Sequence, residues 1–245
     1  METGIYSRKF IVQPDQCSRD ASLSVPGVFN MLQALSAEHA QALGIGAAAM
    51  ARQKKFWVTV HNRVDFTGRA WLLDQLTGQT WAEPCDPDSR TCFRGYALKK
   101  GEEIVALART QWAIINAEGE ALPFRDSGFP EYYVFTQMPG ISESPLWFED
   151  DFEETDLMCE YTVQSTDIDF GFHMNNVVYV RKFLDLFPSD QILSSRIRSF
   201  EIHYVSPCKE QERLKIYRKQ EGEAYRMCIR NAKGQAAVMA SMRIG

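Results

Sequence analysis

Several features that define common protein classes are missing from this sequence of 245 residues. It has no GxGxxG or phosphate-binding glycine loop and no GxSxG turn, which argues against nucleotide-dependent enzymes and against serine hydrolases with a nucleophile elbow. It has no tract rich in lysine or arginine, and its net charge is −5, so the basic face that nucleic acid needs is not expected. No apolar run approaches the roughly 20 residues of a membrane helix. We therefore expect no nucleic-acid partner and no membrane segment.

The six cysteines also lack the spacing of a metal or redox site. None forms a CxxC pair, and Cys85 and Cys92 have no His or Cys companions that would complete a zinc site. The first residues, METGIYSRKFIV, contain no basic segment that leads into a long apolar run. Free thiols are typical of a reducing compartment. The sequence thus predicts a cytoplasmic location and no metal.

The residues that are present are typical of a globular protein with a sizeable core. Hydrophobic residues make up 45% of the chain and charged residues 24%. This length accommodates one large domain or two small ones. Because the net charge is negative, an acidic protein partner could bind only through a local positive patch.

Two segments are predicted to be helices. The first begins after Ser24, a good N-terminal cap, has Pro26 in its first turn and ends at Gly44. The second is predicted to run from near Asn175 to Pro188. Apolar residues recur at helical spacing in both segments, at Val28, Phe29, Leu32, Leu35 and Leu43 in the first and at Tyr179, Phe183, Leu184 and Phe187 in the second.

Most of the remaining sequence is predicted to form strands, because its residues alternate and turn residues separate the runs. In the first half the runs are residues 56–60, 71–73, 104–107 and 112–115. In the second half they are residues 161–163, 200–204, 214–217, 224–229 and 237–239. Each half therefore repeats one order of elements: a strand, a loop, a helix and a run of antiparallel strands.

Short sequence matches support a duplication. Residues 10–13 (FIVQ) resemble residues 161–164 (YTVQ), and residues 100–105 (KGEEIV) resemble residues 233–238 (KGQAAV). Together with the repeated order of elements, these matches favour two similar domains in one chain.

The two domains are predicted to be residues 1–125 and 156–245, joined by a linker of residues 126–155. The linker is rich in proline and aromatic residues, and so many aromatic side chains are not expected to stay in water. We therefore predict that the linker packs across the sheets. Its acidic run, Glu149-Asp150-Asp151, is predicted to be a solvated surface.

The densest polar cluster lies in the loop that enters the second predicted helix. Asp169 precedes His173 by four residues, and Asn175 and Asn176 follow. The N–H groups and partial positive charge of a helix N-terminus can stabilise an oxyanion, and an Asp–His pair can position and deprotonate water. The alternative interpretation is that these Asp and Asn side chains only cap the helix.

The corresponding loop of the first half lacks this acid–base pair. When the halves are aligned through residues 10–13 and 161–164, Ser18 and Ser22 fall opposite Asp169 and His173. One reactive half and one inert half would suit an enzyme in which the inert copy has become a binding or scaffolding wall.

The segment Asp169-Phe-Gly-Phe-His173-Met-Asn175-Asn176-Val-Val-Tyr179 resembles the DxNxHVNNxxY motif of plant and bacterial acyl-acyl carrier protein (acyl-ACP) thioesterases. The resemblance extends over most of the chain, including the first helix, the strand at 56–66 and the segment 204–208. It implies an α+β fold of two tandem hotdog domains, each a long central helix wrapped by an antiparallel β-sheet. It also implies that the first domain binds the acyl chain and the second carries the catalytic motif.

The resemblance implies roles for five residues. Asp169 and His173 match the catalytic Asp and His, and Asn175 and Asn176 match the paired asparagines at the helix start. Cys208 matches a cysteine once proposed as a nucleophile in plant members, although a small buried residue after a strand is the alternative interpretation. Acyl-binding residues implied in the first domain are Met31, Leu32, Leu35, Phe56 and Trp57, each of which could equally belong to an ordinary core.

Two positions depart from the family pattern. Gly171 stands where the motif has Asn, and this removes an amide that could hold the thioester carbonyl or the water. Pro207 stands where the family commonly has Glu, and a proline cannot act as a base. A shifted alignment could let Glu201 or Glu210 supply the missing carboxylate.

These residues predict hydrolysis of fatty acyl-ACP to a free fatty acid, without metal or organic cofactor. An acyl-coenzyme A thioesterase with the same site, a non-catalytic acyl-binding hotdog protein and a hotdog dehydratase are the alternatives. Two hotdog domains in one chain mimic the usual hotdog dimer, so either a monomer or a homodimer is expected.

Overall fold

The computed structural model describes residues 4–193 and 195–245. The elements of the first half are β1 (Ile5–Ile11), α1 (Val25–Ala42), α2 (Ala47–Arg52), β2 (Lys55–Phe66), β3 (Gln75–Ala82), β4 (Thr91–Lys100), β5 (Glu103–Asn116) and β6 (Ala121–Leu122). The elements of the second half are β7 (Leu157–Thr162), α3 (Asn176–Leu184), β8 (Ile197–Tyr204), β9 (Arg213–Glu221), β10 (Ala224–Arg230) and β11 (Ala236–Ile244). Short 3₁₀ turns lie at η1 (Pro14–Gln16), η2 (Phe124–Ser127), η3 (Glu154–Asp156) and η4 (Ser165–Asp167). No helix in these two ranges is both long enough and apolar enough to cross a membrane.

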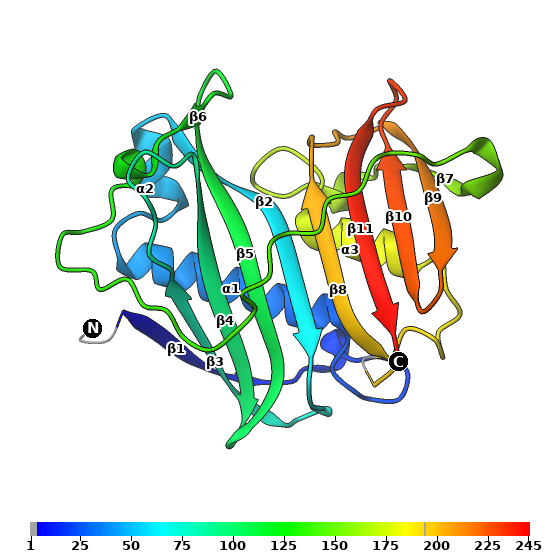
Figure 1. Cartoon of the computed structure of the whole chain (residues 1–245), viewed down its shortest axis with the longest axis horizontal. Helices are drawn as coiled ribbons and strands as arrows, with labels where there is room; N and C mark the ends of the chain where they lie inside the picture. The colour runs from blue at the N-terminus through cyan, green and yellow to red at the C-terminus, as the bar shows by residue number, and fades with distance from the viewer. Residues whose placement is uncertain (1–3, 194) are drawn as a thin grey trace.

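The strands form one antiparallel sheet in the order β1-β3-β4-β5-β2-β8-β11-β10-β9-β7, with β6 paired to β5 (Figure 1). The order within the two halves is identical, because β1 to β5 occupy the same relative places as β7 to β11. The halves join through the equivalent strands β2 and β8, where His61 lies opposite His203 and Val64 lies opposite Phe200. The predicted α+β fold of two tandem hotdog domains is confirmed.

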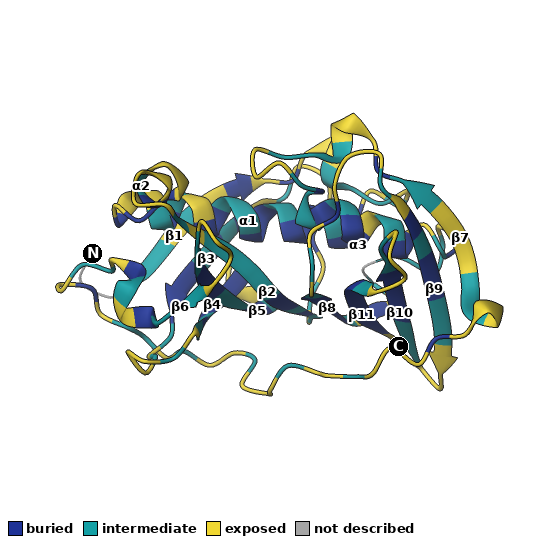
Figure 2. Ribbon diagram, turned by 90° about the horizontal axis from the view of Figure 1, so that it is seen from above, coloured by how far each residue is buried: buried dark blue, intermediate teal, exposed yellow. Residues whose placement is uncertain are grey.

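The two faces of the sheet are covered differently. Helices α1 and α3 lie side by side on one face, and the linker between β6 and β7 crosses the opposite face (Figures 1 and 2). Because side chains alternate along a strand, each residue of the central strands faces either the helices or the linker. A polar residue of these strands can reach the helix N-termini only if its side chain lies on the helix-covered face.

The sequence matches between the halves fall at equivalent places in the structure. Gly101 turns the β4–β5 hairpin with φ +59°, and Gly234 turns the β10–β11 hairpin with φ +75°. Gln13 and Gln164 each form a reciprocal capping box with the 3₁₀ turn that follows β1 or β7. The duplication inferred from the sequence therefore extends to single turns.

Two predicted elements are corrected. Helix α3 ends at Leu184 rather than at Pro188, and the chain continues in tight turns, with the Phe187 N–H donating to the Leu184 carbonyl at 3.1 Å. Phe187 precedes Pro188, a position at which helical geometry is disfavoured, so the helix does not run on to the proline. Residues 71–73 form a turn rather than a strand, with Leu73 at φ +67° and 67% exposed. Three consecutive apolar residues do not alternate with polar ones, so the pattern that favours a strand is absent there.

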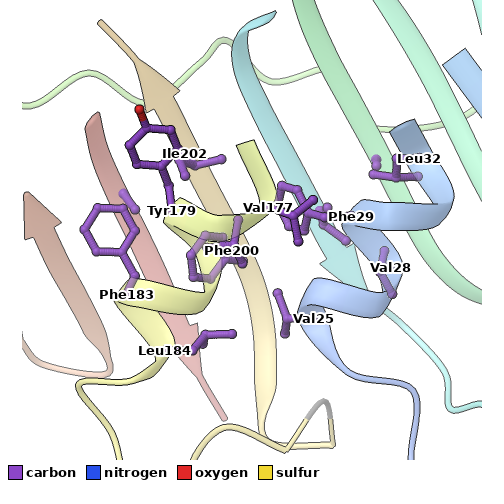
Figure 3. Close-up of a cluster of buried hydrophobic side chains, with 14 of the residues drawn as sticks. Val25, Val28, Phe29, Leu32, Val177, Tyr179, Phe183, Leu184, Phe200 and Ile202 are labelled. Carbon is purple, nitrogen blue, oxygen red and sulfur yellow. The ribbon is translucent and has the colours of Figure 1, made fainter. Parts of the chain in front are cut away.

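Both halves share one core between the helices and the sheet. Phe29 of α1 packs edge to face on Phe200 of β8, with ring centroids 5.8 Å apart. Val177 of α3 belongs to the same buried cluster, and Figure 3 shows these side chains meeting between the two helices. The N-terminal ends of the two helices therefore meet in one core at the junction of the domains.

The linker is fixed to the sheet by ion pairs as well as by aromatic contacts. Asp150 accepts hydrogen bonds from Arg230 at 2.7 and 2.9 Å, and Asp151 accepts one from Arg226 at 2.6 Å. The Trp147 ring lies over His203 with centroids 3.9 Å apart. The predicted packing of the linker is confirmed. The prediction that its acidic run is merely solvated was wrong, since β10 presents two arginines to it.

Candidate active site

The loop before α3 repeats the backbone of the loop before α1. In each loop the residue four places before the first helical residue adopts a left-handed conformation, with Ala21 at φ +64° and Phe172 at φ +62°. In each loop the N-cap side chain binds a backbone N–H of the first turn: Ser24 accepts from Gly27 at 3.1 Å, and Asn175 accepts from Val177 at 2.8 Å. The two loops therefore share one backbone conformation but carry different side chains.

The predicted correspondence of Ser18 and Ser22 with Asp169 and His173 agrees with this geometry. The Ser18 N–H donates to the Ser22 carbonyl at 2.8 Å, and the Asp169 N–H donates to the His173 carbonyl at 3.1 Å. Because the backbone is equivalent, the two serines occupy the places of the carboxylate and the imidazole. Only the second loop can supply acid–base chemistry from these positions.

The Asp169 carboxylate is held from two sides. Its Oδ1 accepts the Gly171 N–H at 2.8 Å, and its Oδ2 accepts the Asn175 side-chain amide at 3.1 Å. Asn175 therefore serves two purposes, since its Oδ1 caps α3 while its Nδ2 orients the carboxylate. The capping and the catalytic interpretations of the sequence are thus compatible, because one asparagine carries out both.

The His173 ring lies on the same side of the loop as the Asp169 carboxylate. A β-carbon added to Gly171 would lie 3.0 Å from both Asp169 Oδ1 and His173 Nε2, so the two polar atoms flank this glycine. His173 Nδ1 lies 3.4 Å from the Met174 carbonyl. In the tautomer that donates to this carbonyl, Nε2 is left as the acceptor, which is the state a general base requires.

Two family models match the two halves of the chain. The family model for the acyl-ACP thioesterase N-terminal domain matches residues 3–123, and that for the acyl-ACP thioesterase C-terminal domain matches residues 151–243. The chain belongs to the acyl-ACP thioesterase family. The predicted resemblance is therefore confirmed.

Curated relatives of the family are distant in sequence. The chain is 24% identical over 227 residues to the chloroplastic oleoyl-ACP thioesterase of Coriandrum sativum, which covers 84% of the chain and 60% of the relative. It is 21% identical over 221 residues to the chloroplastic palmitoyl-ACP thioesterase of Cuphea hookeriana, with 83% and 52% covered. The chain thus spans three fifths or less of the length of these two relatives.

Solved structures of acyl-ACP thioesterases share the fold over their whole length. The enzyme from Bacteroides thetaiotaomicron superposes with a TM-score of 0.88 at 20% identity, covering 99% of this chain and 98% of that one. The 12:0-ACP thioesterase from Umbellularia californica superposes with a TM-score of 0.84 at 17% identity, covering 100% and 98%. At these identities the comparison establishes the tandem hotdog fold alone.

Cys208 lies beneath the site loop of this acyl-ACP thioesterase family member. Its carbonyl accepts the Met174 N–H at 2.9 Å, and its own N–H donates to the Tyr179 hydroxyl at 2.9 Å. Its side chain is fully buried, and burial raises the pKa of the thiol to about 11. Since the thiolate is the nucleophilic form, these features favour a structural role, with Tyr179 of the motif joining α3 to this segment.

Replacing Cys208 with Ala is therefore expected to leave thioester hydrolysis within a factor of about three of the wild-type kcat/KM, because the thiol is not ionised at neutral pH. Steady-state assay of the purified variant measures this. A loss of about two decades or more in a variant that remains folded by circular dichroism would restore the nucleophile interpretation.

Neither Glu201 nor Glu210 supplies a carboxylate to the site loop in this structure. Glu201 lies between Phe200 and Ile202 of the helix-side core, so its side chain faces the linker, where Oε1 binds His61 Nε2 at 2.7 Å and the Leu146 N–H at 2.6 Å. Burial alone raises the pKa of Glu201, but these two hydrogen bonds and the charges of His61 and Arg63 together outweigh it, so the net pKa is lowered. Glu210 is exposed on the loop after β8, as is Pro207.

Glu201→Gln is expected to lower the free energy of unfolding by about 1–3 kcal/mol while preserving hydrolytic activity, because a charge-assisted buried contact is weakened far from the site loop. Urea denaturation and steady-state kinetics measure the two effects. Because the folded-state pKa is depressed, this stabilisation is present above the unfolded-state pKa of about 4.3 and is lost as the pH falls through the folded-state value. The variant should therefore show a smaller loss of stability on acidification. A loss of kcat without a loss of stability contradicts this assignment.

The five predicted acyl-binding residues fall into three environments. Met31, Leu32 and Leu35 are buried along α1 in the core shared by the two halves. Trp57 packs in a separate cluster, and its indole N–H donates to the Ile45 carbonyl at 3.2 Å. Phe56 is 43% exposed near the start of β2. The structure brings the three α1 residues together but keeps both aromatic residues apart from them.

Three polar residues that connect the first domain to the start of α3 were not identified from the sequence. The Tyr204 hydroxyl at the end of β8 donates to the Asn176 carbonyl at 3.3 Å. Removal from water raises the pKa of Tyr204, and a hydrogen bond with Asn62 of β2 acts in the opposite sense. Thr110 of β5 donates in turn to Asn62. This chain of polar groups links the first domain to the helix N-terminus, and no local spacing in the sequence signals it.

Proposed function

We propose that this protein hydrolyses the thioester of fatty acyl-ACP, releasing a free fatty acid and the carrier. The observation that carries the proposal is the pair of equivalent loops: the same backbone holds Ser18 and Ser22 in one half and Asp169 and His173 in the other. Membership of the acyl-ACP thioesterase family supports the reaction class. The names of the relatives support ACP as the carrier.

In the proposed mechanism, water attacks the thioester carbonyl directly. A water molecule beside Gly171 would be within hydrogen-bond reach of both Asp169 Oδ1 and His173 Nε2, because both atoms face that point. Nε2 takes a proton from the water as its oxygen bonds to the carbonyl carbon. The tetrahedral intermediate then expels the thiolate, and the imidazolium returns the proton to sulfur. The glycine that departs from the motif thus makes room for the nucleophile.

The N-terminus of α3 would stabilise the oxyanion. The helix dipole concentrates positive potential at Asn176, immediately after the cap at Asn175, whose side chain binds the Val177 N–H. The Tyr204 and Asn62 contacts fix this end of the helix against the first domain. Asn176 would therefore act through its backbone position, whereas Asn175 would act by orienting Asp169.

The carrier would bind on the surface around the site loop. Phe170 and Phe172 flank Gly171 and are 86% and 87% exposed, which presents two apolar rings beside the reacting atoms. Arg181 on α3 is exposed, and it forms no ion pair within the part of the chain that the structure describes. Such a cation suits an acidic carrier, whose docking then depends on ionic strength.

A substrate panel tests the proposal. The purified chain is incubated with matched acyl-ACP and acyl-coenzyme A substrates over a range of chain lengths, and free fatty acid release is measured. Hydrolysis of the carrier-linked series with higher kcat/KM supports acyl-ACP as the substrate. A preference for the coenzyme A series reassigns the protein to acyl-coenzyme A hydrolysis with the same site. Binding of acyl chains with no acid released from either series shows a non-catalytic acyl-binding protein.

A further inference from the structure

A buried basic cluster lies at the C-terminal end of α1. Arg94 of β4 is only 7% exposed, and its Nη1 donates to His39 Nδ1 at 2.7 Å and to Thr80 Oγ1 at 3.3 Å. These three residues are named the Arg94 cluster. Within residues 4–193 and 195–245, no carboxylate forms an ion pair with Arg94, although burying an uncompensated guanidinium is costly.

His39 adds an unused donor to this cluster. Its side chain is completely buried, and because a guanidinium can only donate, the Nδ1 that meets Arg94 must accept. The proton of the neutral ring is therefore on Nε2, which has no hydrogen-bond partner among the described residues. Burial, aided by the charge of Arg94, lowers the pKa of His39 to about 3, so the ring is neutral. The cluster holds one positive charge and one free N–H.

The Arg94 cluster lies at the far end of the apolar wall that α1 provides. Phe29, Leu32 and Leu35 are followed by His39 at helical spacing, so they share one face of α1. Phe29 meets Val177 at the start of α3, beside the candidate site (Figure 3). With a rise of about 1.5 Å per residue, α1 places His39 about 15 Å beyond Phe29.

We propose that the acyl chains preferred by this protein carry a carboxylate at their distal end, which binds to Arg94 where His39 holds its guanidinium. This inference rests on the proposed function, because it takes the wall of α1 as the place where the acyl chain lies. A carboxylate accepts from the remaining N–H groups of the Arg94 guanidinium and neutralises the buried charge, while His39 Nδ1 keeps the guanidinium in place by accepting from Nη1. A methyl end offers no acceptor and leaves the remaining N–H groups unsatisfied.

Equilibrium binding of two pantetheine thioethers tests the inference. One probe is the S-dodecyl thioether, and the other is the same thioether with a carboxylate on its last carbon; neither can be hydrolysed, and neither has a second acidic group at the pantetheine end. Isothermal titration calorimetry gives both dissociation constants. The carboxylated probe is expected to bind about tenfold or more tightly than the plain one, which is the effect of a charge-assisted contact.

Two variants and one control locate the effect. Arg94→Met removes the charge at similar length. His39→Phe removes the acceptor that positions the guanidinium and keeps an aromatic ring on Tyr6, which stacks on His39 at 5.4 Å. Both are expected to reduce the preference for the carboxylated probe while retaining binding of the plain thioether. Arg90→Met, at an exposed arginine just before β4, is the matched control and should keep the full preference.

Equal affinity of the wild type for both probes overturns the inference, as does a preference that survives in both variants. Failure of the carboxylated probe to bind overturns it as well. These outcomes involve no hydrolysis, so they are separate from the substrate-panel result. A chain that hydrolyses ordinary acyl-ACP but shows no preference between the probes retains its proposed function and loses only this specificity.

Discussion

Asp169→Asn and His173→Ala are each expected to lower kcat/KM for acyl-ACP hydrolysis by about two decades or more, the effect of losing a positioned acid–base group. In Asp169→Asn the loop loses the charge that orients the water and pairs with the Asn175 amide, which donates to this carboxylate at 3.1 Å. In His173→Ala no group remains to take the proton from water. Both changes should act chiefly on kcat, because in the proposed mechanism these groups contact the reacting atoms rather than the acyl chain.

The matched control for Asp169→Asn is Asp185→Asn. Asp185 caps the C-terminal end of α3 and pairs with Lys182 at 3.0 Å on the surface, so the same loss of charge occurs one helix length from the site. It should retain wild-type activity within a factor of about two, since exposed ion pairs contribute little. Asp169 and His173 variants that stay folded and keep near-wild-type kcat would contradict the acid–base assignment.

The largest expected effect on stability comes from Phe200→Ala. Phe200 is completely buried, contacts Phe29 of α1 and lies opposite Val64 where β8 meets β2. Truncation is expected to lower the free energy of unfolding by about 3–5 kcal/mol. The loss includes the hydrophobic transfer free energy of the phenyl ring and the cost of the cavity it leaves, which the packed helices and sheet cannot close. Equilibrium denaturation in urea measures the change.

Phe170→Ala is the matched control for this substitution. The same side chain is removed, but Phe170 is 86% exposed in the site loop, so stability should change by no more than about 0.5 kcal/mol. Because Phe200 joins core contacts from both halves, its loss should shift a single cooperative unfolding transition. A separate early transition of one half, with the other unaffected, would contradict a shared core.

Patterns within short segments determined much of the fold. The cap at Ser24, the apolar stripe of α1 and the glycine turns at Gly101 and Gly234 each depend on neighbours in the chain, and each appears in the structure. The same holds for the site loop, where Asp169 and His173 are four residues apart in one turn of backbone. Such features can be predicted from the sequence because residue type and local backbone geometry are coupled.

The sequence could not show which residues from distant segments meet. Asn62 and Tyr204 approach the start of α3 only because β2 pairs with β8, and Glu201 faces away from the site only because of the register of that pairing. The place of Arg94 beside His39 likewise depends on how α1 lies on β4.

What the sequence determined by itself was therefore the duplication, the helix that follows each loop and the composition of the site loop. What the tertiary structure decided was the face of the sheet on which each polar side chain lies and the partner it finds there. The physical reason is that a strand's alternation fixes two faces but does not say which is inside, and a shift of one residue in pairing exchanges them. That choice is made by the long-range pairing of strands and by the helices that cover one side of the sheet.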